Sequence, residues 1–256
     1  TMSEECLELP FDIHGGGMDL TFPHHENEIA QSCGAHGEDK NPKKFVRYWI
    51  HNAMLNIDGE KMSKSLGNIF YIRDYLKEHH GEVLRLALLS GHYRQSINWT
   101  GETIEQAKSI LDKFYRILSK VSDLKVEEEL IQKCPPKVLE ALCDDLNTSK
   151  ALAELNEISK KLSTADNDND KTKYKIELLS ACRVFGILQE NPKKWLGIGQ
   201  IQDNLDSNFI EQLINERNES RSSKNFQKAD EIRDKLYGMG IEIEDTPNGT
   251  IWRSKT

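Results

Sequence analysis

The side chains best suited to binding or catalysis lie in the sequence DGEKMSKSLGN at residues 58–68, here called the lysine segment. Its basic, hydroxyl and glycine positions are Lys61, Lys64, Ser63, Ser65, Gly59 and Gly67. Two ammonium groups and two hydroxyls can face one polyanion, and a loop of this kind can close over a triphosphate and stabilise charge on leaving pyrophosphate. The same composition is also typical of an exposed turn, so this segment alone leaves both interpretations open.

A second candidate group lies at residues 23–28, with the sequence PHHENE. His24 and Glu28 are four residues apart, so on a helix they project from the same face. An imidazole and a carboxylate both suit Zn²⁺. Two ligands do not complete a zinc site, however, and an exposed, charged helix face would show the same pattern.

The elements that must position these groups read as an alternation of strands and helices. Expected in order are a strand at 10–17 ending in three glycines, a helix from Pro23 to near Gly34 or Gly37, a buried strand within 45–56, and short helices at 71–80 and 82–91. Strand, glycines, helix and strand in this order indicate half of a doubly wound α/β unit.

After Thr100 the pattern becomes helical. Apolar residues recur at spacings of three and four from Ile104 to Leu118, with Thr100 as the expected N-cap. Two or three similar helices are expected between about 136 and 190, interrupted by an exposed polar loop at 163–173. This pattern predicts a helical bundle.

The last part of the chain predicts a small α+β tail, with helices at 207–222 and 225–237 and a hairpin that turns at Pro247–Gly249. The predicted fold class is therefore α/β followed by mostly α. Its three expected domains are the second half of a Rossmann-type domain at 1–100, a helical bundle at 101–195 and the tail at 196–256.

Composition limits the classes of function. The net charge of −8 argues against a protein that coats nucleic acid indiscriminately, although local basic patches can still bind one RNA. No apolar run is long enough for a membrane span, and no signal peptide is evident. The five cysteines are scattered without a CxxC pair, which favours a reducing cytoplasm.

These motifs together resemble a known family. KMSKS at 61–65 resembles the signature loop of class I aminoacyl-tRNA synthetases, and three further segments are similar to cysteine–tRNA ligases in particular: FDIHGGGMDLTFPHHENEIAQS at 11–32, GHYR at 91–94 and GIEIEDTPNGTIWR at 240–253. The resemblance runs in order over the whole chain. It implies ATP-dependent attachment of L-cysteine to tRNA(Cys) through a cysteinyl-adenylate, with Mg²⁺ accompanying ATP.

The resemblance also implies roles for the nucleotide-binding residues. Lys61 and Lys64 would be the catalytic cations. The ATP-binding residues would be Gly17, Asp19, Ser63, Ser65 and Lys64. Asp19 belongs to a Gly-x-Asp pattern whose carboxylate accepts hydrogen bonds from the ribose hydroxyls, as in dinucleotide sites.

In the same family one zinc ion binds the substrate thiolate, and its ligands match His24 and Glu28 together with two cysteines. His14 and His25 would lie near the substrate amino acid, although either could be a structural hydrogen-bonding group. The family's cysteine ligands and its His-Ile-Gly-His motif belong to segments absent from this sequence, and neither Cys6 nor Cys33 is assigned to the zinc. We therefore expect this chain to be the C-terminal part of a longer protein. It would hold half a zinc site and would be incomplete for catalysis by itself.

The tail resembles the anticodon-binding tail of the family. Arg221, Asp230 and Asp245 could hydrogen-bond splayed anticodon bases, and Trp252 could stack on one. Alternatively, Trp252 closes the core of the tail, and Asp230 caps a helix or pairs with a lysine. The expected protein is a monomer. Two other functions stay open: a non-catalytic tRNA-binding fragment, and a cysteine:aminocyclitol ligase, whose family lacks such a tail.

Overall fold

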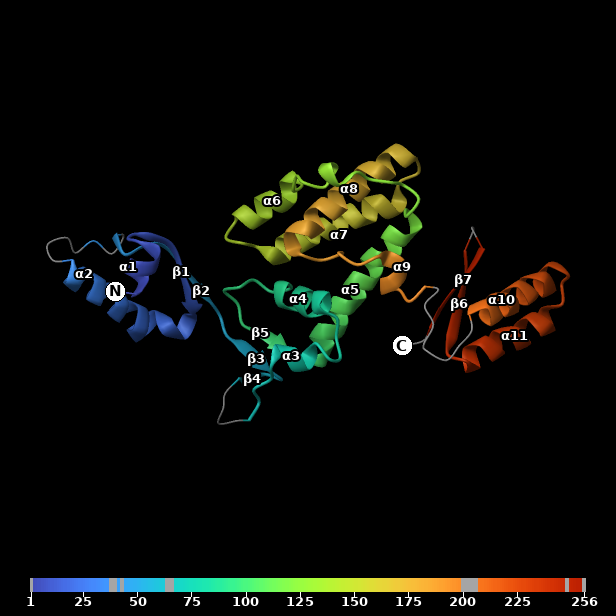
Figure 1. Cartoon of the computed structure of the whole chain (residues 1–256), viewed down its shortest axis with the longest axis horizontal. Coiled ribbons are helices and arrows are strands. Elements are labelled where there is room, and N and C mark those ends of the chain that lie inside the picture. Colours follow the sequence, from blue (N-terminus) through green and yellow to red (C-terminus); the bar gives the residue numbers. More distant parts are fainter. Residues whose placement is uncertain are drawn as a thin grey trace. The chain divides into compact units, whose positions relative to one another are not determined.

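The computed structural model describes residues 2–36, 41, 44–62, 67–198, 207–246 and 249–254 (Figure 1). The chain divides into two compact units. One comprises residues 1–109 and 134–157, and the other comprises residues 110–133 and 158–256. The domain boundaries expected near residues 100 and 196 stay predictions.

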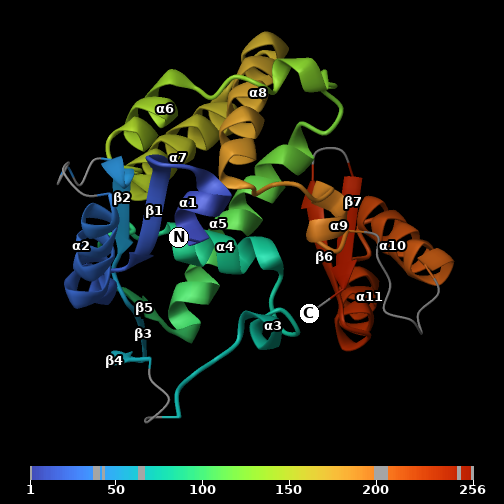
Figure 2. The same ribbon diagram turned by 60° about the vertical axis from the view of Figure 1, so that its left-hand side comes forward.

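The first unit opens with a short helix, α1 (Met2–Leu7), and two parallel strands, β1 (Phe11–Gly17) and β2 (Val46–Asn52). Helix α2 (Glu26–Ala35) lies beside both strands (Figures 1 and 2). Ile29 of α2 packs against a small buried core formed by Phe11, Phe45 and Val46. The strand expected at 10–17 and the helix end expected near Gly34 are confirmed.

The connection between β1 and α2 consists of two tight helical turns, η1 (Met18–Leu20) and η2 (Thr21–His25). Pro23 lies in the second turn, so the regular helix begins at Glu26 and not at Pro23 as expected. Phe22 explains the difference, because its backbone is extended at φ −137° and ψ 132°. A residue that precedes proline is disfavoured in the helical region.

The single strand expected within 45–56 is wrong, because two strands form in different sheets. After β2 the chain enters β3 (Leu55–Ile57), the central strand of a second sheet. There β3 pairs antiparallel with β4 (Glu60–Lys61) and parallel with β5 (Ile97–Trp99). The lysine segment therefore begins on a β-hairpin that β5 flanks.

Helices α3 (Ile72–Tyr75) and α4 (Gly81–Leu89) confirm the two short helices expected after the lysine segment. His80 caps α4 by accepting a hydrogen bond from the backbone N–H of Glu82. The apolar face of α4 is buried through Val83, Leu84, Leu86 and Ala87. The helix lies in the connection between the strands β4 and β5.

The helices of the next region are α5 (Gly101–Lys120), η4 (Glu128–Leu130), α6 (Pro136–Cys143), α7 (Thr148–Thr164), α8 (Asp168–Phe185) and α9 (Pro192–Trp195). Thr100 caps α5 as expected, since its hydroxyl accepts the N–H of Thr103 at 3.2 Å. The exposed loop expected at 163–173 is wrong, because α8 already starts at Asp168. Asn167 accepts the N–H of Asp170 at 2.9 Å, which makes the polar run a helix start.

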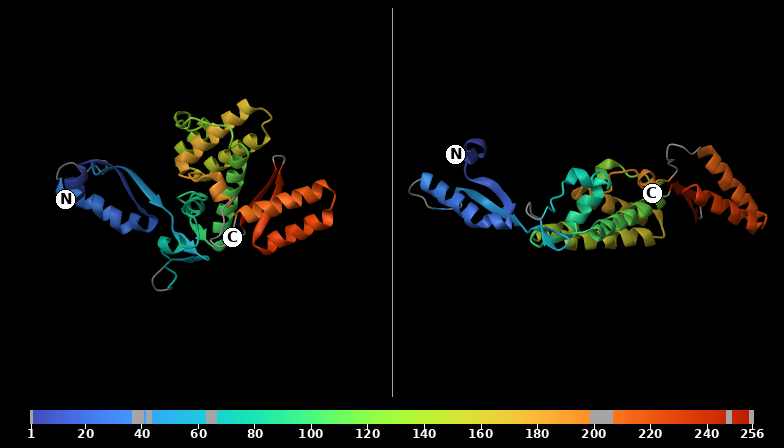
Figure 3. Two further views of the ribbon diagram at one scale, coloured as in Figure 1. Left: turned by 45° about the vertical axis from the view of Figure 1, so that its right-hand side comes forward. Right: turned by 90° about the horizontal axis from the view of Figure 1, so that it is seen from below.

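The tail, residues 207–254, forms as expected from two helices and a hairpin. Helices α10 (Ser207–Ser222) and α11 (Phe226–Gly238) lie side by side, and α11 leads into β6 (Ile241–Thr246) and β7 (Gly249–Ser254) (Figure 3). The expected turn residues Pro247 and Asn248 lie outside the described residues. The core of the tail consists of Ile210, Leu213, Ile214, Ile232, Leu236, Ile241 and Trp252.

Among the helices that the structure describes, none combines the length and the apolar character that crossing a membrane requires.

Candidate functional site

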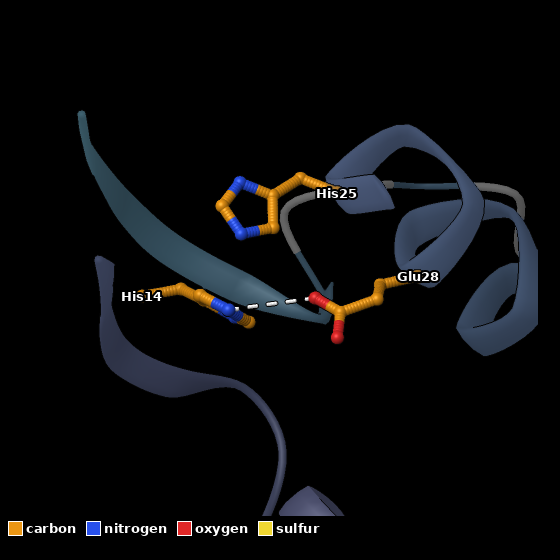
Figure 4. A group of neighbouring side chains, drawn as sticks. All are labelled: His14, His25 and Glu28. Carbon is orange, nitrogen blue, oxygen red and sulfur yellow. Dashed lines mark ion pairs between the residues drawn. The ribbon is translucent and has the colours of Figure 1, made fainter. Parts of the chain in front are cut away.

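Four side chains from β1, η2 and α2 converge in the first unit, and we call His14, His24, His25 and Glu28 the histidine cluster. Figure 4 shows three of them pointing toward one another. His14, His25 and Glu28 each offer a ligand atom within 4.8 Å of the other two. His14 Nε2 lies 3.4 Å from Glu28 Oε2, and His24 Nε2 lies 3.5 Å from Glu28 Oε1. The expected approach of His24 and Glu28 across one helical turn is therefore observed.

Two polar atoms of the cluster are buried and lack a hydrogen bond to any residue that the structure describes: His14 Nδ1 and Glu28 Oε2. Leaving such atoms unpaired costs free energy, so they usually indicate a missing ligand, ion or water. Imidazole nitrogens and a carboxylate oxygen are also the ligand types that bind Zn²⁺. The residues present thus fit a metal ion, with Glu28 common to both histidine contacts.

His25 is the most enclosed member of the cluster, with 3% of its surface exposed. Its Nδ1 lies 2.8 Å from Nε2 of His51 on β2. Burial lowers the pKa of His25, and the nearby His14 and His51 lower that pKa further. Gly16 provides the necessary space, since a Cβ at that position would stand 2.8 Å from Cε1 of His25.

Two aromatic side chains of β2 support the cluster, and the sequence interpretation missed both. The ring of Trp49 stacks on His14 with centroids 4.5 Å apart and an interplanar angle of 21°. The ring of His51 stacks parallel to that of Trp49, with the two ring centroids 5.9 Å apart. Trp49 and His51 are two residues apart, so they share one face of the strand. That alternation within FVRYWIHN is the signal that could have identified them.

Some of the residues expected to bind ATP lie close together in the structure. Lys61 Nζ lies 3.9 Å from Asp19 Oδ2, so the first lysine of the lysine segment approaches the expected ribose ligand. A Cβ at Gly17 would stand 2.7 Å from Asp19 Oδ1, so the glycine leaves the room that the carboxylate occupies. The remaining members of the expected set, Ser63, Lys64 and Ser65, lie outside the described residues.

In the tail, the expected tRNA ligand Asp245 is engaged within the fold. Arg217 donates two hydrogen bonds to the Asp245 carboxylate, at 2.9 Å each, and Thr250 donates a third at 2.8 Å. These bonds from Arg217 hold the pKa of Asp245 well below its usual range. The side chain of Arg217 is 7% exposed. Its position after Ile210 and Leu213 on the apolar face of α10 is the signal that was missed, because a charge placed there requires a buried partner.

The other tail candidates differ in exposure. Trp252 is 8% exposed and belongs to the tail core, which is the second of the two roles left open by the sequence. Its ring is therefore not available to stack on a base. Arg221 also contacts the Asp245 carboxylate but is 46% exposed, and Asp230 is exposed. The roles of Arg221 and Asp230 in tRNA binding stay predictions.

Comparison with known families gives two matches along the chain. Residues 1–109 match the family described as tRNA synthetases class I (C) catalytic domain. Residues 137–189 match the DALR domain. The histidine cluster, Asp19 and Lys61 all fall within the first match.

The chain is similar over nearly its whole length to proteins named cysteine–tRNA ligase. The one from Parvibaculum lavamentivorans is 44% identical over 252 residues, which cover 98% of this chain and 53% of the relative. The one from Rhodospirillum rubrum is 46% identical over 253 residues, which cover 98% of this chain and 54% of the relative. The chain thus spans about half the length of the curated relatives it matches.

A solved structure supports the fold. The crystal structure of a LeuRS from Agrobacterium radiobacter K84, in a ternary complex with tRNA and LeuAMS, matches with a TM-score of 0.50 and 20% identity. The match covers 70% of this chain and 25% of that chain. Together with the match of residues 1–109 to the class I catalytic domain, this shared fold confirms the expected class I synthetase architecture.

Proposed function

Because the chain belongs to the cysteine–tRNA ligase family and spans about half the length of its relatives, we propose that it carries part of the machinery that attaches L-cysteine to tRNA(Cys) with ATP. The ionised carboxylate of cysteine attacks the α-phosphate of ATP, cysteinyl-adenylate forms, and pyrophosphate leaves. A hydroxyl of the 3′-terminal ribose of the tRNA then attacks the cysteinyl carbonyl, the bond from that carbonyl to the phosphate breaks, and AMP leaves. The observation that carries the proposal is the approach of Lys61 to Asp19, a residue that lies between members of the histidine cluster in the sequence.

The nucleotide-binding residues act by position and charge. The Asp19 carboxylate accepts hydrogen bonds from the ribose hydroxyls, beside the space that Gly17 leaves. Lys61 and Lys64, with Ser63 and Ser65, would contact the phosphates of ATP, whose bound Mg²⁺ would neutralise further phosphate charge. No general base is needed for the first step because the attacking carboxylate is already ionised, so catalysis consists of orientation and stabilisation of the leaving pyrophosphate.

The histidine cluster selects the amino acid. Glu28 and His24 are the residues of this chain that would hold a zinc ion, and a bound zinc supplies a preference for sulfur over a hydroxyl oxygen. His14 and His25 then lie beside the amino acid, where the support of Trp49 and His51 fixes their rings. Selection through a specific bond discriminates far better than pocket size, so cysteine is separated from serine without an editing step.

Cysteine-dependent ATP–pyrophosphate exchange tests this function. It is measured on the 256-residue chain alone and on the chain mixed with a polypeptide that matches the other half of the relatives' length. We expect exchange only in the mixture. Full exchange by the chain alone would refute the division of the machinery, and no exchange in the mixture would refute the enzyme function for this chain.

Substitution of two neighbouring glycines tests the nucleotide site. In Gly17→Ala the new Cβ would stand 2.7 Å from Asp19 Oδ1, whereas in Gly15→Ala the new Cβ meets only Ile50 O, at an ordinary 3.7 Å. We therefore expect Gly17→Ala to weaken ATP binding by about tenfold or more, since a misplaced contact is costly in such sites. Gly15→Ala should bind ATP as the unaltered chain does. Equal affinities in the two variants would place the ribose elsewhere.

A tRNA-binding role without catalysis is the second candidate. It is favoured by the folded tail, on which Arg221 and Asp230 are exposed. Binding of tRNA(Cys) by the chain, with no exchange in the mixture described above, would select it. The folded tail argues against a cysteine:aminocyclitol ligase. The monomeric state and the cytoplasmic location stay predictions.

A further inference from the structure

A polar junction lies within the first unit, between the connection of α6 to α7 and the segment that precedes β5. Arg94 Nε donates to Asp145 Oδ2 at 2.6 Å, and Arg94 Nη2 donates to Asp145 Oδ1 at 3.1 Å. The hydroxyl of Tyr93 donates to Asp145 Oδ1 at 2.6 Å, and His92 Nε2 lies 3.9 Å from Oδ2. Asp145 thus holds three consecutive residues. It falls within the DALR match, whereas they fall within the catalytic-domain match.

The junction is more than an exposed ion pair, which by itself contributes little. The hydroxyls of Thr148 and Ser149 donate to the carbonyls of Gly91 and Ser90, at 3.1 and 2.9 Å, and so join the same two segments. Asp145 itself has a left-handed backbone, with φ 54°. A non-glycine residue adopts this conformation rarely, and it persists where surrounding contacts fix it. The hydrogen bonds from Arg94 and Tyr93 lower the pKa of Asp145 to about 2, so it stays ionised.

The residues held by Asp145 in turn hold the hairpin that carries Lys61. The carbonyl of Tyr93 accepts the N–H of Ala53, the residue between β2 and β3, at 2.8 Å. Further on, β5 pairs with β3 in parallel, and Asn98 Oδ1 accepts the N–H of Gly59 at 2.7 Å. The segment that contains Tyr93 and β5 therefore fixes the β3–β4 hairpin at its start, along its strand and at its turn.

We propose that Asp145 is a positioning residue for the lysine segment: it fixes Tyr93 and Arg94, which fix Ala53 and β5, and it thereby sets where the β3–β4 hairpin presents Lys61. This role rests on the proposed function, in which the lysine segment contacts the phosphates of ATP. It also gives the helical region a physical connection to the nucleotide site, through a carboxylate that touches neither nucleotide nor Lys61.

Amide hydrogen exchange on the full chain tests the connection directly. In Asp145→Asn the charge-assisted bonds from Arg94 are weakened, so we expect the Ala53 amide to exchange about tenfold faster. Tyr93→Phe removes one hydroxyl without an unpaired charge and should give a smaller rise at the same amide. The matched control is Asp144→Asn, since Asp144 is the adjacent carboxylate, 67% exposed and 3.8 Å from Lys150. In that variant the Ala53 amide should exchange at the unaltered rate.

Two outcomes would overturn the proposal. One is an unchanged Ala53 amide in both Asp145→Asn and Tyr93→Phe. The other is a uniform rise over all amides of the first unit, which would show general destabilisation. Amides of β6 and β7 in the tail provide the internal reference, because no described contact joins them to Asp145.

Nucleotide affinity separates positioning from a purely structural role. In Asp145→Asn we expect the affinity for ATP to fall about fivefold while the affinity for AMP is unchanged, since only ATP presents the β- and γ-phosphates to the lysine segment. Lys61→Ala should abolish that difference between Asp145→Asn and the parent. Equal loss for ATP and AMP would overturn the positioning role. Failure of the unaltered chain to bind either nucleotide would instead count against the proposed function, and the Ala53 amide would still decide the connection.

Discussion

In the histidine cluster, His14 Nδ1 and Glu28 Oε2 are buried without a hydrogen bond to the described residues, whereas in the tail the Asp245 carboxylate accepts three bonds from Arg217 and Thr250. Both regions place histidine, carboxylate or arginine groups where a sequence pattern suggests function. Of the two regions, only the histidine cluster leaves buried ligand atoms without a hydrogen bond to a described residue, which is typical of a site that binds a further group. Groups whose hydrogen bonds are satisfied within the fold, such as the Asp245 carboxylate, mainly stabilise the folded structure.

The apolar residues of the two regions differ in the same direction. Ile13 and Tyr48 stand opposite each other in β1 and β2 and are 59% and 67% exposed. In the tail, by contrast, Trp252 is 8% exposed within a closed core. The tail therefore stabilises itself through its own packing. Substitutions there should change stability, and substitutions in the histidine cluster should change binding.

The largest effect is expected for Trp252→Ala. Removing a buried Trp ring from a core leaves a cavity, so the free energy of unfolding of the tail should fall by about 3–5 kcal/mol. Hydrogen exchange of the β6 and β7 amides under increasing urea measures this. Phe226→Ala is the matched control, because Phe226 is an aromatic residue of the tail that is 60% exposed, and it should shift stability by less than about 0.5 kcal/mol. A stable Trp252→Ala tail that no longer binds tRNA would restore the stacking role and break the comparison.

Asp245→Asn should have the next largest effect. It leaves the Arg217 guanidinium buried without its counter-charge, which typically costs 3–5 kcal/mol in a fully buried pair. Because Asp245 is 42% exposed, water reduces the cost, and we expect about 2 kcal/mol. Arg221→Gln removes an exposed partner of the same carboxylate and should cost less than about 1 kcal/mol. Urea denaturation followed at the tail amides measures both, and equal losses would show that Arg217 is not the main partner.

The pH dependence of the tail follows from the same pair. The pKa of Asp245 is lowered by the bonds from Arg217, relative to an ordinary value of 3.8. A lowered pKa contributes stability that is present above 3.8 and is lost as the pH falls below it. The tail should therefore hold constant stability from neutral pH to about pH 5 and weaken on further acidification. Asp245→Asn should show a flatter profile, and an identical slope in both proteins would assign the acid sensitivity to other carboxylates.

The elements and the residue types of the site could be predicted from the sequence, whereas their pairing could not. Periodicity and caps located β1, α5 and the tail helices because these signals are local. The break between β2 and β3 was missed, since it depends on pairing with β5, which is distant in the sequence. For the same reason the pattern identified His24 and Glu28, one turn apart, but not Trp49 beside His14 or Arg217 beside Asp245.

The substitution Glu28→Gln should change the free energy of unfolding least and the affinity for zinc most. The amide keeps the shape of the side chain, and Glu28 Oε2, although 3.4 Å from His14 Nε2, accepts no hydrogen bond from a described residue. The free energy of unfolding should therefore change by less than about 0.5 kcal/mol. Zinc affinity, measured by equilibrium dialysis, should fall by at least about tenfold, because Glu28 would be a direct ligand. Glu26→Gln alters an exposed carboxylate in the first turn of the same helix and should change neither quantity. If Glu28→Gln destabilised the first unit as strongly as Asp245→Asn destabilises the tail, the cluster would be a structural ion pair, and the contrast between the two regions would disappear.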